Sequence, residues 1–215
     1  MEKMHDTKAR KAKCGSGKNM GCSDKKTAAQ RVFETAQGLF YQRGIRAVGV
    51  DEIVAQAGVT KPSLYRSFAS KDDLVTACLN KYVEEAHAAL DARVAAVGDD
   101  PREKLRAYVA FFAEKIAQPD YRGCALSNAA VEFPEPGHPG RCVMEASKTR
   151  SRDQLSMLAR QLPTRDPDAL ADNILLLIEG AQSSHHVFGS QGPAQAIVKG
   201  ADALIEAFTT GDMAS

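Results

Sequence analysis

Residues 50–74, VDEIVAQAGVTKPSLYRSFASKDDL, decide the fold of this chain. Apolar residues recur at every third or fourth position from Val50 to Ala57, which predicts a helix of about two turns with one buried face. Gly58 then interrupts the pattern, because glycine accepts the positive φ angle that a sharp reversal of the chain requires. Leu64 and Phe68 mark a second short helix. Two short helices joined by a turn that contains glycine form a helix-turn-helix pattern.

The second of these helices carries polar side chains that suit contact with DNA. The polar residues at or near its start are Thr60, Lys61, Ser63, Tyr65 and Arg66. This is the end of a recognition helix that enters a major groove. Lysine and arginine bind phosphates or guanine edges, and hydroxyl groups commonly bind phosphates. The Thr60 hydroxyl can also cap the helix. The alternative is that Leu64 and Tyr65 are core residues and the basic residues form a solvated face.

Another helix begins directly after this segment. The Ser70 hydroxyl can accept a hydrogen bond from a free amide of the first turn, and Asp72 and Asp73 suit the positive end of a helix. Lys71 lies at the same helix start, where free amides and a positive side chain together can hold a phosphate. The apolar pattern then continues as far as Gly98, which predicts a long helix.

Outward from this segment, the apolar pattern stays helical in both directions. The predicted helices cover about residues 27–43, 50–57, 61–68, 70–97, 105–118, 123–133, 140–162, 168–187 and 194–209. We therefore predict an all-α protein with an N-terminal three-helix helix-turn-helix domain and a C-terminal helical domain. The expected divisions are a basic arm over 1–26, a DNA-binding domain over 27–79 and a C-terminal domain over 80–215. The second boundary falls inside the long helix, which would join the two domains rigidly.

Charge is distributed unevenly along the chain. The 215 residues contain 28 lysines and arginines against 27 acidic residues, which gives no general affinity for nucleic acid. Residues 1–26, however, hold eight of the basic residues and three of the acidic ones. Basic arms favour polyanions. We expect this arm to be disordered without DNA and to add phosphate or minor-groove contacts when DNA is present; the alternative is a solvated tail without a role.

The composition also bears on location. No apolar run approaches the roughly 20 residues that span a bilayer, and no apolar segment follows the basic N-terminus as it would in a secretory signal. We therefore expect a cytoplasmic protein with no membrane partner. The five cysteines, Cys14, Cys22, Cys78, Cys124 and Cys142, are an odd set without metal-type spacing, so we expect reduced thiols.

Nothing in the sequence indicates an enzyme. It contains no nucleophile–base pair and no metal cluster at a recognisable spacing, so we expect no catalytic residues, no metal and no cofactor. The adjacent His185 and His186 would point about 100° apart on a helix and could not chelate one metal together. A helical interaction scaffold without DNA activity is the alternative from another class, and the basic recognition helix argues against it.

Residues 31–74 resemble the N-terminal domain of TetR/AcrR-family transcriptional regulators. The matching segments are Gly44-Ile45, Val50–Ile53, Ala57–Lys61, Ser63–Phe68 and Ser70–Leu74. The resemblance implies a homodimer that binds a palindromic operator in double-stranded DNA. It also implies a repressor that a small-molecule effector releases by binding the C-terminal ligand-sensing and dimerisation domain.

We expect one set of DNA contacts from the motif and the resemblance together. These contacts are Gly49, Thr60, Lys61, Ser63, Leu64, Tyr65, Arg66 and Lys71. The chain departs from the family where Val48-Gly49 replaces a common Ser/Thr pair before the second helix. Gly49 can still cap that helix at a small energetic cost, but it lacks the hydroxyl that makes a phosphate contact in the family.

The C-terminal half is less informative about the effector. Tyr108, Phe111 and Phe112 suit a mostly apolar ligand pocket, with ordinary core as the alternative. Asn128 and Glu132 share a helical face, as either a polar pocket wall or a surface pair. The candidate ligand contacts are Tyr108, Phe111, Phe112, Cys124 and Asn128. The residues leave the effector, the operator sequence and the choice between repressor and activator open.

Cys124 supports a second hypothesis for the effector response. It follows Arg122 near a predicted helix start, a setting that favours the reactive thiolate. A thiol-based sensor of oxidants or electrophiles is therefore the alternative to reversible ligand binding. A buried and inert cysteine is the interpretation that competes with it.

The last two predicted helices are apolar on more than one side. Such helices must be buried partly in their own domain and partly against a partner. The predicted dimer contacts are Ile174, Ile178, Ala181, Ile197, Leu204 and Ile205. Pairing with the same helices of a second chain would form a four-helix interface.

Overall fold

The computed structural model describes residues 26–210, which form helices and no strand. The N-terminal helices are α1 (Ala28–Arg43), α2 (Val50–Ala57), α3 (Lys61–Ser67) and α4 (Lys71–Ala95). The following helices are α5 (Pro101–Ile116), α6 (Ala125–Glu132), α7 (Pro139–Ala159) and α8 (Pro167–Phe188). The 3₁₀ turns η1 (Gly189–Gln191) and η2 (Pro193–Ala196) lead into α9 (Ile197–Thr210). The predicted all-α fold is confirmed. The basic arm expected over 1–26, including Cys14 and Cys22, lies outside the described part except for Lys26.

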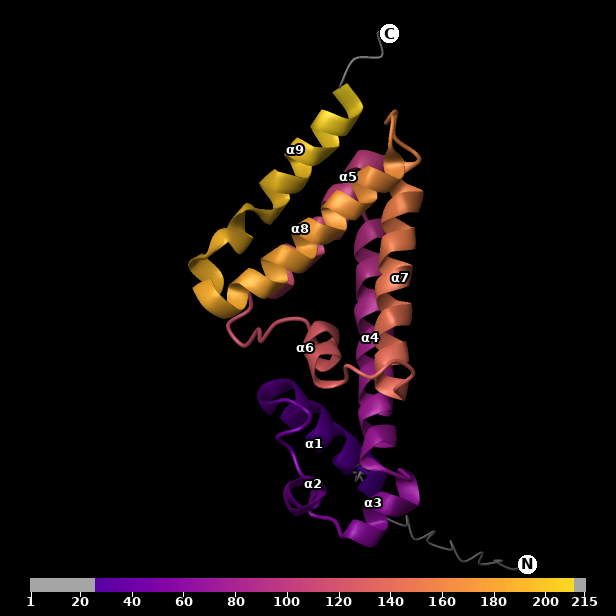
Figure 1. Ribbon diagram of the computed structural model, residues 1–215, viewed down its shortest axis with the longest axis vertical. Coiled ribbons are helices and arrows are strands. Elements are labelled where there is room, and N and C mark those ends of the chain that lie inside the picture. The colour runs from indigo at the N-terminus through magenta and orange to yellow at the C-terminus, as the bar shows by residue number, and fades with distance from the viewer. Residues whose placement is uncertain (1–25, 211–215) are drawn as a thin grey trace, which may run out of the picture.

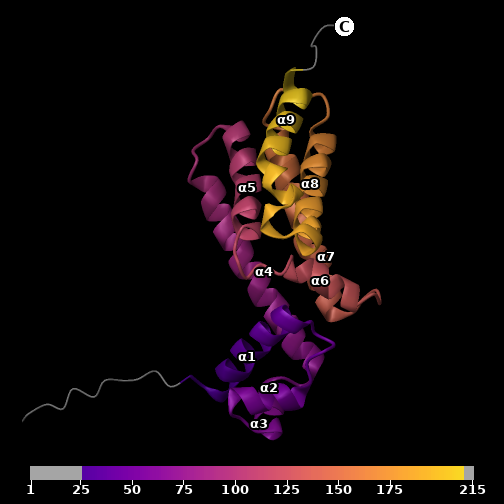
Figure 2. The ribbon, with the colours of Figure 1, turned by 90° about the vertical axis from the view of Figure 1, so that its left-hand side faces the viewer.

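Helices α1, α2 and α3 form one end of an elongated molecule (Figures 1 and 2). The turn between α2 and α3 begins at Gly58, whose φ of 62° is the positive angle that the sequence predicts there. Arg31 of α1 donates from Nε to the Ala57 carbonyl at 3.0 Å and so satisfies a free carbonyl at the end of α2. Ile53 and Leu64, one from each helix of the motif, are fully buried. The apolar residues that predict the motif from the sequence therefore also form its core.

The long helix α4 connects the two ends of the molecule. It spans 25 residues, or about 37 Å at 1.5 Å per residue, and lies alongside α7 for much of its length (Figure 1). Its first turn is capped as expected, because the Ser70 hydroxyl accepts the Asp73 amide at 3.0 Å.

The buried residues form two hydrophobic cores. The first core joins α1, α2, α3 and the start of α4, and it also includes Leu126, Ala129 and Phe133 from α6 and its C-terminal end, with Met144 of α7. Helix α6 therefore packs against the DNA-binding end of the molecule and crosses the division expected at residue 80. The second core joins the far part of α4 with α5, α7, α8, η2 and α9. This second core holds most of the C-terminal bundle together.

Two helices begin later than the sequence predicts. Helix α6 starts at Ala125 rather than Gly123, because Gly123 has a φ of +85°, which no right-handed helix contains. Helix α9 starts at Ile197, because the preceding residues form the η2 turn. No described helix is long and apolar enough to cross a membrane. Residues 26–210 contain no group of three or more His, Cys, Asp or Glu that could hold a metal ion.

Candidate DNA-binding face and effector cavities

The recognition helix α3 presents most of its predicted contact residues outward. Lys61, Tyr65 and Arg66 are exposed and Ser63 is half-buried, with 48% of the Tyr65 surface accessible. Leu64 is 0% exposed and packs in the first core, so its prediction as a DNA contact is wrong. The reason is helical geometry, since position 64 faces α1 and α2 while its neighbours face away from them.

The starts of α2 and α3 differ from the expected capping. Thr60 occupies the N-cap position of α3, but its side chain accepts no capping hydrogen bond, which corrects the prediction. The Thr60 carbonyl instead accepts the amides of Ser63 at 2.9 Å and Leu64 at 3.1 Å. Gly49 caps α2 with an extended backbone and no side chain, as its residue type requires. Both N-cap residues are exposed.

The two lysines predicted to contact DNA already have partners in the protein. Lys61 forms an ion pair of 2.7 Å with Asp51, and this hydrogen bond raises the pKa of the ammonium group. Lys71 donates from Nζ to the Ile45 carbonyl at 2.6 Å, and burial lowers its pKa. The ammonium group that is predicted to hold a phosphate therefore already has a backbone acceptor in the protein. Its side chain folds back onto the connection between α1 and α2.

That connection is also held from the opposite side by α6. Glu132 accepts the backbone amides of Ile45 at 2.9 Å and Arg46 at 2.6 Å. Gly44 makes this approach possible, because its φ is +88° and a Cβ there would lie 3.2 Å from Glu132 Oε1. The sequence places Glu132 beside Asn128 on one helical face, but no periodicity indicates a partner 87 residues away. The carboxylate fixes the C-terminal domain to the segment that leads into the helix-turn-helix.

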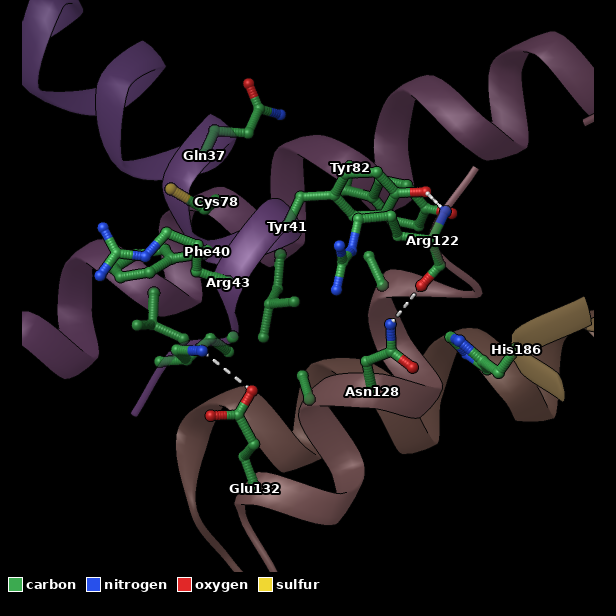
Figure 3. A pocket seen from close by; sticks show the side chains of 16 residues that line it. Gln37, Phe40, Tyr41, Arg43, Cys78, Tyr82, Arg122, Asn128, Glu132 and His186 are labelled. Atoms are coloured by element: carbon green, nitrogen blue, oxygen red, sulfur yellow. Dashed lines mark hydrogen bonds between the residues drawn. The ribbon is translucent and has the colours of Figure 1, made fainter. Parts of the chain in front are cut away.

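A second link joins α1 to the segment before α6. The Tyr41 hydroxyl accepts the Arg122 amide at 2.9 Å and donates to the Gly123 carbonyl at 3.3 Å. Asn128 then donates from Nδ2 to the Arg122 carbonyl at 2.8 Å (Figure 3). Together with Glu132, these bonds span the junction between the DNA-binding end and the C-terminal bundle.

The structure contains a cavity of about 530 Å³ at this junction, which we call the junction cavity. Its walls come from α1, α4, α6 and the end of α8 (Figure 3). The labelled lining residues are Gln37, Phe40, Tyr41, Arg43, Cys78, Tyr82, Arg122, Asn128, Glu132 and His186. Of the five predicted ligand contacts, only Asn128 lies here. Sequence reasoning missed this cavity because its walls are far apart in the chain.

The other four predicted ligand contacts line a separate cavity inside the C-terminal bundle, which we call the inner cavity. Tyr108, Phe111, Phe112 and Cys124 are among its walls, and its volume is about 50 Å³. Burial raises the pKa of Tyr108 to about 12, so its hydroxyl is neutral. Gln182 also lines this cavity; its Oε1 is buried without a hydrogen-bond partner.

Cys124 lies at the N-cap of α6, close to the helix start that the sequence predicts. Its thiol is buried, and Sγ lies 3.8 Å from Lys148 Nζ. Lys148 is also ion-paired with Glu179 of α8. The cysteine therefore combines the burial expected of an inert residue with the cationic neighbour expected of a reactive one.

The predicted dimer contacts are mostly core residues of the single protomer. Exposure is at most 1% for Ile174, Ile178, Ile197 and Ile205, and 8% for Ala181. A side chain with almost no accessible surface in the single protomer cannot contact a second chain, so these five assignments are wrong. Leu204 is half-buried against the same core. The apolar repeat identified the inward side of each helix, whereas Leu176, Val187 and Phe188 are the large apolar residues of α8 that remain exposed.

A compact three-helix unit with an exposed polar recognition helix, joined by one long helix to a helical bundle, defines a helix-turn-helix DNA-binding transcriptional regulator rather than an enzyme. Residues 32–78 match the family model of bacterial regulatory proteins of the tetR family. A crystal structure of a TetR-family transcriptional regulator from Streptomyces coelicolor is similar, with a TM-score of 0.81 and 30% identity over 85% of this chain and 96% of that one. The chain belongs to the TetR family of transcriptional regulators.

Two relatives show how far the sequence similarity extends. The transcriptional regulator AcuR of Cereibacter sphaeroides is 27% identical over 77% of this chain and 79% of its own length. The transcriptional activator FasR of Mycolicibacterium smegmatis is 41% identical, but the match covers 36% of this chain and only 35% of FasR. The higher of these two identities is thus confined to a segment of 78 residues.

Proposed function

We propose that this regulator is a repressor that binds a palindromic operator as a homodimer and is released by a small-molecule effector in its C-terminal domain. The observation that carries the proposal is the outward polar face of α3 at the end of the molecule, with the C-terminal bundle at the other end of α4 (Figure 1). This arrangement leaves α3 free to enter a major groove while the bundle pairs with a second chain. Such a protein would work in the cytoplasm, where the operator is.

The proposed DNA contacts follow from exposure. Lys61 and Arg66 are the cations of the recognition helix, and they suit phosphates or guanine edges. Tyr65, Ser63 and Thr60 offer hydroxyl groups to phosphates. Gly49 is exposed at the N-cap of α2, and the free amides of a helix start suit a further phosphate. Lys61 must exchange its Asp51 partner for DNA, so the ion pair competes with operator binding.

The proposed dimer interface lies on the exposed faces of α8 and α9. Leu176, Gly180, Ser183 and Val187 share one side of α8 at spacings of four, three and four residues, and all four are exposed. Leu176 is 70% and Val187 77% accessible in the single protomer. On α9, Ala203 and Ala207 are small, exposed and one helical turn apart. Small residues between large apolar ones let helices of two chains approach closely.

The inner cavity is the proposed effector site within the C-terminal domain, and it must widen from its volume of about 50 Å³ to admit a ligand. Phe111 and Phe112 provide an apolar wall, and Gln182 offers a buried acceptor that a ligand donor can satisfy. A ligand must favour a dimer geometry in which the two recognition helices no longer match the groove spacing. Reciprocity then requires operator DNA to weaken effector binding by the same factor.

A thiol-based response is the second candidate, supported by the 3.8 Å approach of Lys148 Nζ to Cys124 Sγ. In this version the thiolate adds to an electrophile such as an α,β-unsaturated carbonyl compound. A sulfur–carbon bond forms, the carbon–carbon π bond breaks, and the enolate takes a proton from the ammonium group or water. The adduct occupies the inner cavity permanently rather than reversibly.

Operator binding by the full-length protein tests the proposed function. Duplexes are selected from a random pool by the purified protein, and binding is measured by fluorescence anisotropy at several salt concentrations. The expected result is a two-fold symmetric site, bound by one dimer with a steep salt dependence. A protein that selects no duplex, or that binds all duplexes alike, would be the helical scaffold without operator activity. Light scattering on the same sample gives the oligomeric state.

A further inference from the structure

We propose that the junction cavity is a second effector site, which binds a small molecule with an apolar body and an anionic group and thereby changes operator affinity. The coupling to DNA rests on the proposed function above; the binding site itself does not. The junction cavity and the inner cavity share a single lining residue, Tyr82, so they are separate sites.

The size and the floor of the junction cavity suit a small organic ligand. Its volume of about 530 Å³ lies within the roughly 300–1,000 Å³ typical of ligand pockets. Phe40 of α1 and Val75 and Leu79 of α4 form an apolar floor, and Ala125 and Ala129 of α6 leave space above it. These side chains offer no hydrogen bonds, so the body of the ligand must be apolar. In the same structure, the inner cavity has a volume of about 50 Å³ and has room for only a few non-hydrogen atoms.

The charges around the cavity select an anion. Arg43 is already paired with Glu52, and the Glu132 carboxylate is occupied by two backbone amides. Within residues 26–210, the Arg122 guanidinium forms no ion pair or hydrogen bond, and Arg122 borders the cavity next to Tyr41 (Figure 3). Arg122 is therefore the lining cation without a partner, whereas the Glu132 carboxylate keeps its charge and is held in place by the two amides. Arginine binds carboxylates and sulfonates in a fork of two hydrogen bonds.

The walls of the cavity explain why occupancy would affect DNA binding. Phe40 and Tyr41 belong to α1, whereas Asn128 and Glu132 belong to α6. Glu132 is both a wall of the cavity and the acceptor for the segment that leads into α2. A ligand that contacts both walls changes the spacing between α1 and α6, so it biases the orientation of the helix-turn-helix relative to the bundle. A ligand with unequal affinity for two orientations shifts their populations.

The test uses the full-length protein and two fluorescent probes of similar shape. Anilinonaphthalene sulfonate has an aromatic body and an anionic group, and phenylnaphthylamine has the same body without the charge. We expect the sulfonate to bind wild-type protein with an increase in fluorescence, and Arg122→Ala to lower its affinity about tenfold or more, as for removal of a charged hydrogen bond. The affinity for phenylnaphthylamine should stay within about twofold. Arg122 is exposed, so its truncation leaves folding intact.

A plugged cavity provides the second arm. Ala125→Phe places a ring in the junction cavity, and Val131→Phe on the same helix is the matched control, because Val131 is 83% exposed and outside the cavity. We expect Ala125→Phe to remove sulfonate binding and Val131→Phe to leave it unchanged, with equal helical content by circular dichroism. Saturating operator DNA should shift the sulfonate affinity of the wild type by about fivefold or more, the lower end of allosteric coupling.

The outcomes separate the site from the proposed function. Sulfonate binding that is unaffected by Arg122→Ala, or equal for both probes, would overturn the anion site. Binding that survives Ala125→Phe in a folded protein would place the probe elsewhere and overturn the cavity assignment. Sulfonate affinity that is unchanged by a duplex the protein demonstrably binds would overturn the coupling. Failure to bind any duplex, in contrast, counts against the proposed function, while the two probe measurements still decide the site.

Discussion

The carboxylate of Glu132 and the backbone amide of Ile45 are 2.9 Å apart across the junction of the molecule, although 87 positions separate them in the sequence. The same carboxylate accepts the Arg46 amide, while Lys71 donates to the Ile45 carbonyl from the other side. The segment between α1 and α2 is thus held by α6 and by α4 at once. These bonds connect the C-terminal bundle directly to the segment that leads into the helix-turn-helix.

Replacing Glu132 tests this link. Glu132→Ala leaves two amides of the α1–α2 connection without their acceptor, so we expect a decrease of about 1–3 kcal/mol in the free energy of unfolding, measured in urea. Hydrogen exchange at the Ile45 and Arg46 amides should become faster than in the wild type. The control is Glu135→Ala in the exposed loop after α6, which should change neither quantity. Slow exchange at both amides in Glu132→Ala would show that the link is dispensable.

The recognition helix is tested by its cations. The double variant Lys61→Ala and Arg66→Ala should lower operator affinity by at least tenfold and reduce the salt slope by about 0.9 for each phosphate that is no longer neutralised. Helical content and dimerisation should be unchanged, since both side chains are exposed. Arg165→Ala, in the exposed loop between α7 and α8, is the control for removal of a surface charge. A double variant with normal affinity would place the recognition surface elsewhere.

The ion pair between Asp51 and Lys61 predicts a substitution that raises operator affinity. Asp51→Asn removes a charge that repels phosphates and frees Lys61, whose Nζ is 2.7 Å from the carboxylate. We expect operator affinity to rise severalfold at low salt and the gain to shrink at high salt, because exposed charges are screened. Anisotropy titrations at two salt concentrations measure this. Lower affinity in Asp51→Asn would mean that the carboxylate positions Lys61 rather than competing with DNA.

The fold was predictable from local sequence patterns. The sites were predictable only where their residues are close together in the sequence. The Gly58 turn, the Ser70 cap and the all-α class follow from neighbouring residues, because helix boundaries depend on a few adjacent side chains. The inward direction of Lys71 and the pairing of Glu132 with Ile45 depend on contacts between distant segments, which periodicity does not encode. The same limit explains the junction cavity, whose walls come from four helices.

The dimer residues show a further limit of periodicity. An apolar stripe indicates that one side of a helix is buried. It does not indicate whether the residues that bury it belong to the same chain or to a partner. Ile178 lies on that stripe and is 1% exposed in the protomer, whereas Leu176 lies off it and is 70% exposed. An interface therefore has to be inferred from what the folded protomer leaves uncovered.

This distinction predicts different outcomes for two substitutions on α8. Leu176→Glu places a charge on the proposed interface, so we expect folded monomers by light scattering and weak operator binding. Ile178→Glu buries a charge in the second core, so we expect loss of cooperative unfolding rather than a folded monomer. A dimer that persists in Leu176→Glu at micromolar concentration would move the interface away from this face of α8.

The thiol hypothesis is tested by comparing cysteines in different environments. Burial raises the pKa of the Cys78 thiol to about 12, so at about pH 7 to 9 it stays protonated and should resist alkylation by N-ethylmaleimide. Exposed Cys142 should react first, and it is replaced by serine together with Cys14 and Cys22 to remove that background. In this background, we expect mass spectrometry to find one adduct, at Cys124 beside Lys148, and operator DNA to be released as the adduct accumulates. Cys124→Ser should then keep its DNA throughout the titration. Release of DNA at the same rate from both proteins would end the thiol hypothesis and leave reversible binding in the cavities as the route to induction.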